Sequence, residues 1–322
     1  MKKILLLLLL LSFTAFSMPV ETYIIPYFSK ISGPYYKGGV DTLIIKDIKR
    51  AKRSVSMAMY YLTNKKITQA LIDAHRRGLS VEVVTDDKKK NSSKYKQLLR
   101  AGITVHNDRN SKALMHNKIL ILDKKIVWIG SANYTVYSFY RNLDNFLKIE
   151  DKDIALYYSK KFKNLYTYST QKINSYRTKE LEIYFSPDTN FENKLISLVK
   201  NAKHSLYFLA FAFTNQKLAD ALVEAKARGV EVKGVFDKSQ NKYQKYSQYD
   251  FMKKHSLNVK LDKNKFKLHS KVLIVDEKIV VTGSYNFTKT ANSKNAENSI
   301  VIYSDAIAKK YVKNFEYIFK MK

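Results

Sequence analysis

The sequence predicts an α/β fold built from two similar halves, and three observations support this prediction. Segments of the first half recur in the second half at a nearly constant separation. Each half alternates short β-branched stretches with amphipathic ones. The composition, with 45% hydrophobic residues and only four Pro among 322 residues, is that of a packed protein rather than a disordered one. We therefore expect two duplicated halves, each a mixed sheet flanked by helices.

The internal repeat divides the chain near its middle. Residues 51–54 recur as residues 202–205, which lie 151 residues further on, and Asp86 is matched by Asp237 at the same separation. Beyond these positions the separation becomes 153, which indicates a two-residue insertion in an intervening loop. The predicted domains are residues 18–175 and residues 176–322.

Hydrophobic periodicity places the elements of the first half, and the second half repeats their order. We expect β-α-β units followed by a hairpin around residues 123–125 and a closing helix. The expected strands are residues 55–61, 80–84, 103–106, 116–122 and 126–129, and the expected helices are residues 66–77, 94–101 and 153–168.

Residues 1–17 are predicted to be a signal peptide. Lys2 and Lys3 precede an apolar run, and the run ends in a small-x-small sequence at Ser17. A membrane-spanning helix needs about 18 to 20 apolar residues, and this run stops short of that before Pro19. We therefore expect an exported protein, periplasmic or secreted.

The charge and the cysteine count limit the chemistry. The chain has no Cys, which excludes disulfides, thiolate catalysis and Cys-ligated zinc. With 58 Lys and Arg against 28 Asp and Glu, the net charge is +30, a value that favours nucleic acid, anionic membrane or another polyanion as a partner. A genome whose codons favour Lys would produce the same excess, so the charge alone does not choose a partner.

Six positions with fixed spacing occur in both halves and carry the chemical signal. Each copy has the form His-x-Lys-x4-Asp-x6-Gly-Ser-x-Asn. The first copy comprises His116, Lys118, Asp123, Gly130, Ser131 and Asn133, and the second comprises His269, Lys271, Asp276, Gly283, Ser284 and Asn286.

The residue types suit the cleavage of a phosphodiester. Side chains two apart on a strand share a face, so each His is expected to project together with its Lys. Cleavage needs a nucleophile, an acid for the departing oxygen and positive charge at the non-bridging oxygens. Two His and two Lys meet these needs, and the amides of Asn133 and Asn286 could add donors. With the paired His used in this way, we expect no cofactor and no catalytic metal.

A carboxylate follows each motif His at the same distance. Asp144 lies 28 residues after His116, and Glu297 lies 28 residues after His269. A nucleophilic imidazole must be neutral and must present one defined nitrogen, so its other nitrogen needs an acceptor. We predict that Asp144 and Glu297 orient the two histidines.

The other motif positions are predicted to be structural. Asp123 and Asp276 lie seven residues after their histidines, an odd number that places them off the catalytic face and at a turn. Gly130 and Gly283 are expected to allow close backbone approach at the end of a strand. Ser131 and Ser284 are expected to line the site or to bond locally.

The doubled motif resembles that of the phospholipase D superfamily over nearly all of the chain after residue 17. The resemblance implies two α/β halves that pack around a pseudo-twofold axis, so that both motifs form one site and a monomer suffices. It also implies a two-step displacement without metal, in which His116 attacks phosphorus and forms a phosphohistidine, His269 protonates the leaving alcohol, and Lys118 and Lys271 hold the phosphoryl oxygens. The repeat permits the two His to exchange these roles.

The substrate stays open between two classes. The tandem arrangement resembles phospholipases, whereas residues 268–298 resemble bacterial nucleases and mitochondrial cardiolipin hydrolases of the same superfamily. Basic segments with aromatic residues, at 88–96 and 238–249, could follow a nucleic-acid backbone or contact the headgroups of an anionic membrane. We expect phospholipid diesters first, nucleic acid second, and an inactive polyanion-binding protein third.

Overall fold

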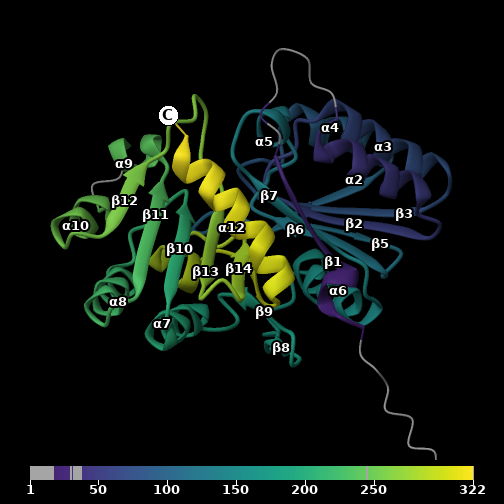
Figure 1. The fold of residues 1–322 in the computed structure, drawn as a ribbon. Helices are drawn as coiled ribbons and strands as arrows, with labels where there is room; N and C mark the ends of the chain where they lie inside the picture. The colour runs from purple at the N-terminus through teal and green to yellow at the C-terminus, as the bar shows by residue number, and fades with distance from the viewer. Residues whose placement is uncertain (1–17, 30, 32–37, 244–245, 322) are drawn as a thin grey trace, which may run out of the picture.

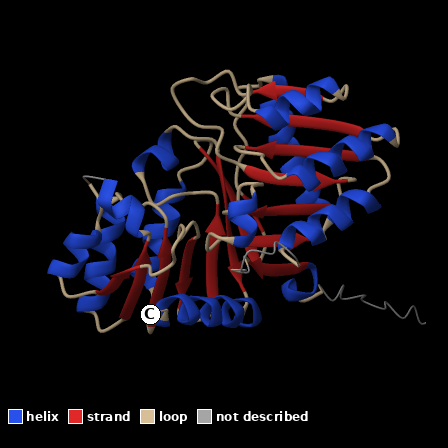
Figure 2. Ribbon diagram, turned by 90° about the horizontal axis from the view of Figure 1, so that it is seen from above, coloured by secondary structure: helices blue, strands red, loops and turns tan. Residues whose placement is uncertain are grey.

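The structure is a computed structural model, and it describes residues 18–29, 31, 38–243 and 246–321. Its core consists of two mixed β-sheets that lie side by side, each with helices on its outer face (Figures 1 and 2). The predicted α/β class with two duplicated halves is confirmed. The predicted signal peptide at residues 1–17 lies outside the described residues.

The first sheet has seven strands in the order β1-β7-β6-β5-β2-β3-β4. Its strands are β1 (Ile24–Phe28), β2 (Ser54–Met59), β3 (Ser80–Thr85), β4 (Thr104–Asn107), β5 (Lys118–Leu122), β6 (Ile126–Gly130) and β7 (Asn145–Ile149). The helices of this half are α1 (Val20–Tyr23), α2 (Val40–Arg50), α3 (Lys65–Arg76), α4 (Ser93–Arg100), α5 (Val136–Tyr140) and α6 (Lys152–Thr167).

The second sheet repeats this order as β12-β11-β10-β13-β14-β15-β9, with the short β8 added at its edge. Its strands are β8 (Tyr176–Arg177), β9 (Leu181–Ser186), β10 (Ser205–Ala210), β11 (Glu231–Phe236), β12 (Asn258–Leu261), β13 (Lys271–Val275), β14 (Ile279–Gly283) and β15 (Glu297–Tyr303). The helices are α7 (Phe191–Asn201), α8 (Gln216–Ala227), α9 (Lys238–Tyr243), α10 (Tyr249–Lys254), α11 (Lys289–Ser293) and α12 (Asp305–Lys320).

The strands and helices expected in the first half lie within about two residues of their predicted bounds, whereas β1, β7, α1, α2 and α5 were not predicted. Repeated polar pairs in the sequence mark helix starts. Asn64 accepts hydrogen bonds from the amides of Lys66 and Ile67 at the start of α3, and Asn215 accepts one from Leu218 at the start of α8. Such caps satisfy amides that a helix leaves unpaired.

Three apolar clusters hold the layers together. One lies under the outer helices of each half, and the third lies between the halves, where α6 and α12 pack against both inner sheet faces (Figure 1). In this central cluster Tyr158 and Phe162 of α6 lie with Tyr311 and Phe315 of α12. The central position of this cluster indicates that neither half is complete without the other.

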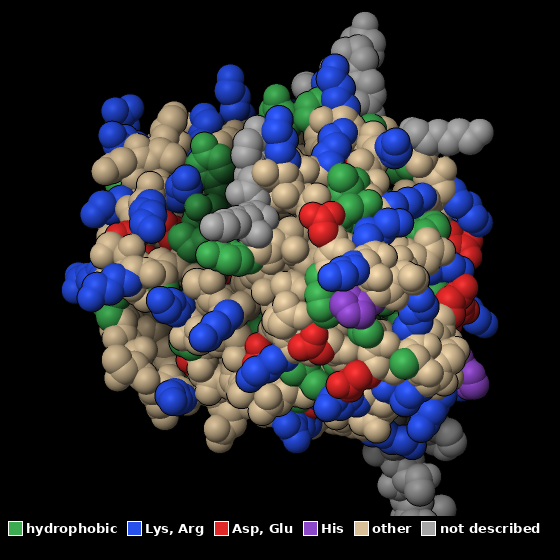
Figure 3. All heavy atoms as spheres, turned by 90° about the vertical axis from the view of Figure 1, so that its left-hand side faces the viewer, with side chains coloured by type: hydrophobic (Ala, Val, Ile, Leu, Met, Phe, Trp, Pro, Cys, Tyr) green, Lys and Arg blue, Asp and Glu red, His purple; other side chains and the backbone are tan. Residues whose placement is uncertain are grey.

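Basic side chains are spread widely over the outer face of the second half, with fewer acidic ones between them (Figure 3). Among the described residues, no helix combines the length and the apolar character needed to cross a bilayer.

Candidate active site

The two motif histidines lie at the junction of the halves, each two residues before a central strand. His116 precedes β5 and His269 precedes β13, and the two side chains are almost fully buried. The strands begin at the lysines and not, as expected, at His116, because the preceding segments pair with the opposite half. The amide of His116 donates to the carbonyl of Ala296 at 2.9 Å, and the amide of His269 donates to Leu143 at 2.9 Å.

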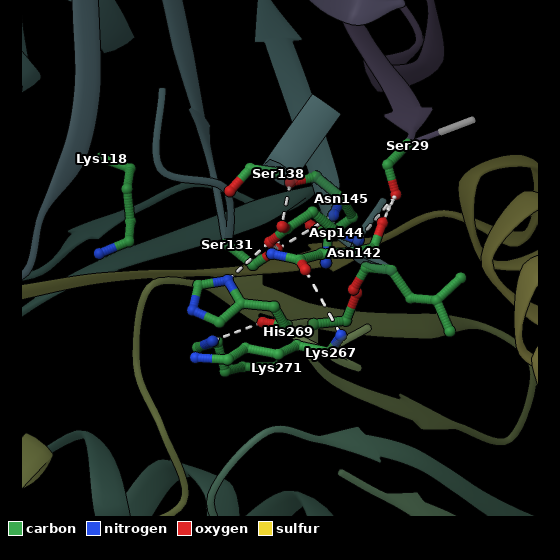
Figure 4. Close-up of polar contacts among 12 residues, drawn as sticks. Ser29, Lys118, Ser131, Ser138, Asn142, Asp144, Asn145, Lys267, His269 and Lys271 are labelled. Carbon is green, nitrogen blue, oxygen red and sulfur yellow. Dashed lines mark hydrogen bonds and ion pairs between the residues drawn. The ribbon is translucent and has the colours of Figure 1, made fainter. Parts of the chain in front are cut away.

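The carboxylates that contact the histidines are exchanged between the halves. His116 Nδ1 lies 2.8 Å from Glu297 Oε2. His269 Nδ1 lies 2.7 Å from Asp144 Oδ1, the pair that Figure 4 shows. With both carboxylates ionised, each Nδ1 carries its proton and donates it, so the free lone pair of each ring is on Nε2. Each half thus supplies the partner for the histidine of the other.

Two serines hold these carboxylates. Ser131 Oγ donates to Asp144 Oδ1 at 2.6 Å and accepts from the amide of Asn145 at 3.0 Å (Figure 4). Ser284 Oγ donates to Glu297 Oε2 at 2.5 Å and accepts from the amide of Asn298 at 3.1 Å. Each motif serine therefore fixes the carboxylate relative to the backbone amide of the residue that follows that carboxylate. This limits the positions that the imidazole can take.

The motif lysines are buried beside the histidines. Lys118 Nζ donates to the carbonyl of His116 at 2.6 Å, and Lys271 Nζ donates to the carbonyl of His269. Burial, together with the positive charge of the opposite lysine, lowers the pKa of Lys118 to about 7, and burial is the main cause of a similar shift to about 7 for Lys271. An anion that entered between them would be attracted strongly, because it would restore the charge balance of a desolvated site.

The histidines are held in their neutral form. Burial lowers the pKa of His116, and the charges of Lys118 and Lys271 add to this effect against the opposing influence of Glu297. Burial and Lys271 lower the pKa of His269 to about 4. Burial raises the pKa of Asp144, but its contacts with His269 and Lys271 outweigh this effect, so the pKa lies below its usual range.

The motif asparagines have unused hydrogen-bonding capacity. Asn133 lines a cleft of about 600 Å³ together with His269. The Oδ1 atoms of Asn133 and Asn286 are buried and have no partner among the described residues. We still expect their amide groups to donate hydrogen bonds to a bound phosphoryl group.

The motif aspartates lie away from the histidines. The carboxylate of Asp123 accepts from the amides of Lys52, Arg53 and Ser54 at 2.7 to 2.9 Å, and Asp276 accepts from the matching amides of the second half. Asp123 therefore ties the β5–β6 turn to the loop before β2.

The motif glycines end β6 and β14 with positive φ angles. A Cβ atom on Gly130, whose φ is 146°, would lie 2.3 Å from the carbonyl oxygen of Asn145, and one on Gly283 would lie 2.2 Å from that of Asn298. Only glycine permits this close approach. The close approach at Gly130 sets the position of β7, which follows Asp144. The close approach at Gly283 sets the position of β15, which begins with Glu297.

Sequence reasoning missed several residues that place the histidines. Asp86 Oδ2 accepts from the amide of Met115 at 3.1 Å, and Asp237 Oδ2 accepts from that of Leu268 at 2.8 Å. The repeat had matched these two aspartates without assigning them a role. The rings of Tyr60 and Phe211 pack edge-on against His116 and His269, at centroid distances of 5.3 and 4.7 Å.

Three carboxylates gather beside the His116 segment, which the sequence did not predict. Ligand atoms of Asp86, Asp87 and Asp108 lie within 4.8 Å of one another, and no other group of this kind occurs among the described residues. Burial, together with the nearby Asp86 and Asp87, raises the pKa of Asp108 to about 6. An acidic group alone does not define a metal site, and the expectation of metal-free chemistry stays a prediction.

The fold and the site define a class of duplicated α/β proteins in which two His-Lys motifs meet at one junction. A family model described as "Cardiolipin synthase, PLD-like domain" matches residues 44–166 and again residues 195–319. The chain belongs to this family of phospholipase D-like domains.

Two relatives each match about two fifths of this chain. A phospholipase D of Rickettsia bellii is 37% identical over 131 residues, which are 41% of this chain and 65% of that protein. A mitochondrial cardiolipin hydrolase of Xenopus laevis is 32% identical over 133 residues, 40% of this chain and 63% of its own length. The chain thus spans slightly less than two thirds of the length of these relatives.

A solved structure matches both halves together. The phosphatidylserine synthase of Haemophilus influenzae Rd KW20 is similar over 93% of this chain and 86% of its own, with a TM-score of 0.67 and 16% identity. At that identity the similarity concerns the fold alone.

Proposed function

We propose that the chain is a phosphodiesterase that hydrolyses its substrate in two steps through a phosphohistidine. The proposal rests mainly on the exchange of carboxylates, in which Glu297 and Asp144 each bind Nδ1 of the histidine from the other half. Both Nε2 atoms thus stay available, and buried Lys118 and Lys271 flank them. A nucleophile, a proton carrier and two cations are then combined in one desolvated junction.

In the first step His116 Nε2 forms a bond to phosphorus while the bond to one alcohol oxygen breaks. His269, protonated when the anionic diester binds, gives its Nε2 proton to the departing alcohol. In the second step His269 removes a proton from water, the water oxygen bonds to phosphorus, and the nitrogen–phosphorus bond breaks. Lys118 and Lys271 balance the charge on the non-bridging oxygens throughout, and Asn133 and Asn286 donate hydrogen bonds to them.

Phospholipid diesters are the first substrate class proposed. Support comes from the names of the relatives, phospholipase D and mitochondrial cardiolipin hydrolase, and from a net charge of +30 that suits anionic surfaces. Nucleic acid is the second candidate, because lysines and aromatic rings also occur together close to His116. The ammonium group of Lys89 lies 5.4 Å from the ring centroid of Tyr60 and 5.1 Å from that of Tyr61.

Purified protein incubated with phospholipid vesicles and with plasmid DNA, both with a chelator present, separates the candidates. Release of a headgroup from the vesicles is the expected result, and cleavage of DNA alone would overturn the lipid proposal. Binding of both polyanions without any turnover would support the third class, an inactive binding protein.

The mechanism is tested with bis(4-nitrophenyl) phosphate. We expect His116→Ala and His269→Ala each to lower kcat by at least about 10³-fold, because each histidine acts in both steps. The exposed His255, which lies outside the junction, supplies the matched control His255→Ala. Near-normal turnover in either active-site variant would exclude a shared site. A rapid quench at alkaline pH, where the nitrogen–phosphorus bond survives, should trap the 4-nitrophenyl phosphoryl group on His116.

We also propose that the protein is exported after cleavage near Ser17 and acts as a monomer. All the residues named above come from one chain, so no second copy is needed to complete the site. N-terminal sequencing of the protein from the periplasm or medium, together with light scattering at assay concentration, tests both points. A retained leader in an active intracellular protein would contradict export.

A further inference from the structure

The cleft beside His269 is lined by aromatic and basic side chains from both halves. Tyr137 of α5 meets Phe266 edge-on at a centroid distance of 5.5 Å, and Tyr61 lies on the same cleft. The ring of Tyr137 is 58% exposed, so it is open to a ligand. Lys238, Lys265 and Lys267 line the same cleft with exposed side chains. Lys238 Nζ donates to the carbonyl of Asn264 at 2.7 Å, and none of the three forms a direct ion pair with a carboxylate of the described residues.

The corresponding positions beside His116 carry different side chains. The two segments are equivalent, because the carbonyl of Lys267 accepts from Leu143 as the carbonyl of Leu114 accepts from Ala296. The residues at the positions of Tyr61, Tyr137, Phe266, Lys238 and Lys267 are Ala212, Thr290, Ala113, Asp87 and Leu114. Only Lys265 is matched by another lysine, Lys112.

The charge also differs between the two sides. Asp87 stands at the position of Lys238 and forms part of the acidic group with Asp86 and Asp108. Asp86 and Asp108 have counterparts beside His269, Asp237 and Asp262, so the two sides differ by the change from Asp87 to Lys238 and from Leu114 to Lys267. The duplicated catalytic residues are therefore symmetric, but the surroundings of His269 carry more positive charge than those of His116.

We propose that the cleft binds its diester in one orientation only. One of the two groups esterified to the reacting phosphate, here called the arm, lies between Lys238 and Lys267 and carries a second phosphate. The inference rests on the proposed phosphodiesterase function and adds a subsite to it. If His116 attacks in line, the group that departs lies on the opposite side, at His269. The departing alcohol would therefore carry the second phosphate, and any ring on it would contact Tyr137 and Phe266.

Inhibition of bis(4-nitrophenyl) phosphate turnover measures this subsite without assuming a natural substrate. The inhibitors are 3-hydroxypropyl phosphate, propane-1,3-diol bisphosphate and thymidine 3′,5′-bisphosphate. We expect the bisphosphates to bind at least about tenfold more tightly than the monophosphate, since one charge-assisted contact is added. Equal inhibition by the monophosphate and both bisphosphates would overturn the proposal.

Exchange of residues between the two sides supplies the variants. Lys267→Leu installs the residue found at the matching position and should remove most of the preference for a second phosphate. Lys112→Leu replaces a lysine by leucine on the other side, at the position that matches Lys265, and should leave both turnover and preference unchanged. Loss of the preference in both variants would show a general charge effect and would contradict a one-sided subsite.

The thymine ring of the nucleotide inhibitor distinguishes an arm that comes from a nucleotide from one that comes from a lipid. Tighter binding of the thymidine compound than of the propanediol compound, reduced by Phe266→Ala, would assign the arm to a nucleotide. Equal binding of the two would assign it to a lipid polyol and still support the subsite. If the wild type does not hydrolyse bis(4-nitrophenyl) phosphate at all, the proposed function fails. If only the subsite proposal is wrong, the wild type still hydrolyses bis(4-nitrophenyl) phosphate.

Discussion

At the scale of single residues, the carboxylate on each imidazole decides which nitrogen is free. Asp144 uses Oδ1 for both His269 and Ser131, whereas its buried Oδ2 has no partner among the described residues. Glu297 accepts from Asn295 at 3.2 Å through its second oxygen. The two pairs thus differ in how firmly they are held.

Replacement of Asp144 by Asn tests the positioning role. The amide can turn its NH2 group toward His269 Nδ1, which would favour the wrong tautomer, so we expect kcat to fall by about 10² to 10⁴-fold. The carboxylate variant Asp144→Glu should keep more activity. Proton NMR should show loss of the downfield His269 Nδ1–H signal in Asp144→Asn, and unchanged activity without that signal would refute the role.

The lysines predict how anion binding depends on pH. Lys118 and Lys271, with pKa values of about 7, are charged below that pH and neutral above it. The inhibition constant of sulfate, which does not titrate in this range, should therefore rise about tenfold or more between pH 6 and pH 8.5. Competition assays on bis(4-nitrophenyl) phosphate measure it, and a constant value across this range would mean that both lysines stay charged.

At the scale of elements, the end of β6 controls the site through backbone distance. Gly130→Ala places a methyl group against the carbonyl of Asn145, so we expect unfolding to become easier by roughly 2 to 4 kcal/mol. Gly78→Ala is the control, because Gly78 also has a positive φ but open space around it, and it should cost only about 1 kcal/mol. Urea unfolding compares the two, and similar losses would exclude the steric cause.

Elements also differ in how well the sequence reveals them. Helices α3 and α8 have amphipathic periods and terminal glycines, and these local signals predicted them. Helix α2 and strand β1 were missed because their place is set by distant partners: β1 pairs with β7, more than one hundred residues away in the chain. Long-range pairing of this kind leaves little trace in local periodicity.

At the scale of the whole molecule, the junction makes the two halves depend on each other. The central apolar cluster contains residues of both, and each histidine takes its carboxylate from the opposite half. We expect residues 18–175 and residues 176–322 to be inactive when produced separately and to recover turnover when produced together. Full activity of a monomeric first half would contradict this, and copurification with gel filtration would confirm the pairing.

The sequence by itself determined the duplication, the motif residues and a carboxylate 28 positions after each histidine, because repeated spacing survives as a linear pattern. Only the tertiary structure decided which carboxylate serves which histidine, since that depends on packing between the halves. It likewise revealed Asp86 and Asp237 as anchors of the histidine segments, and it placed a basic, aromatic cleft on one side of a symmetric site. Contacts between distant segments follow from the packing of the whole chain, which no local spacing records.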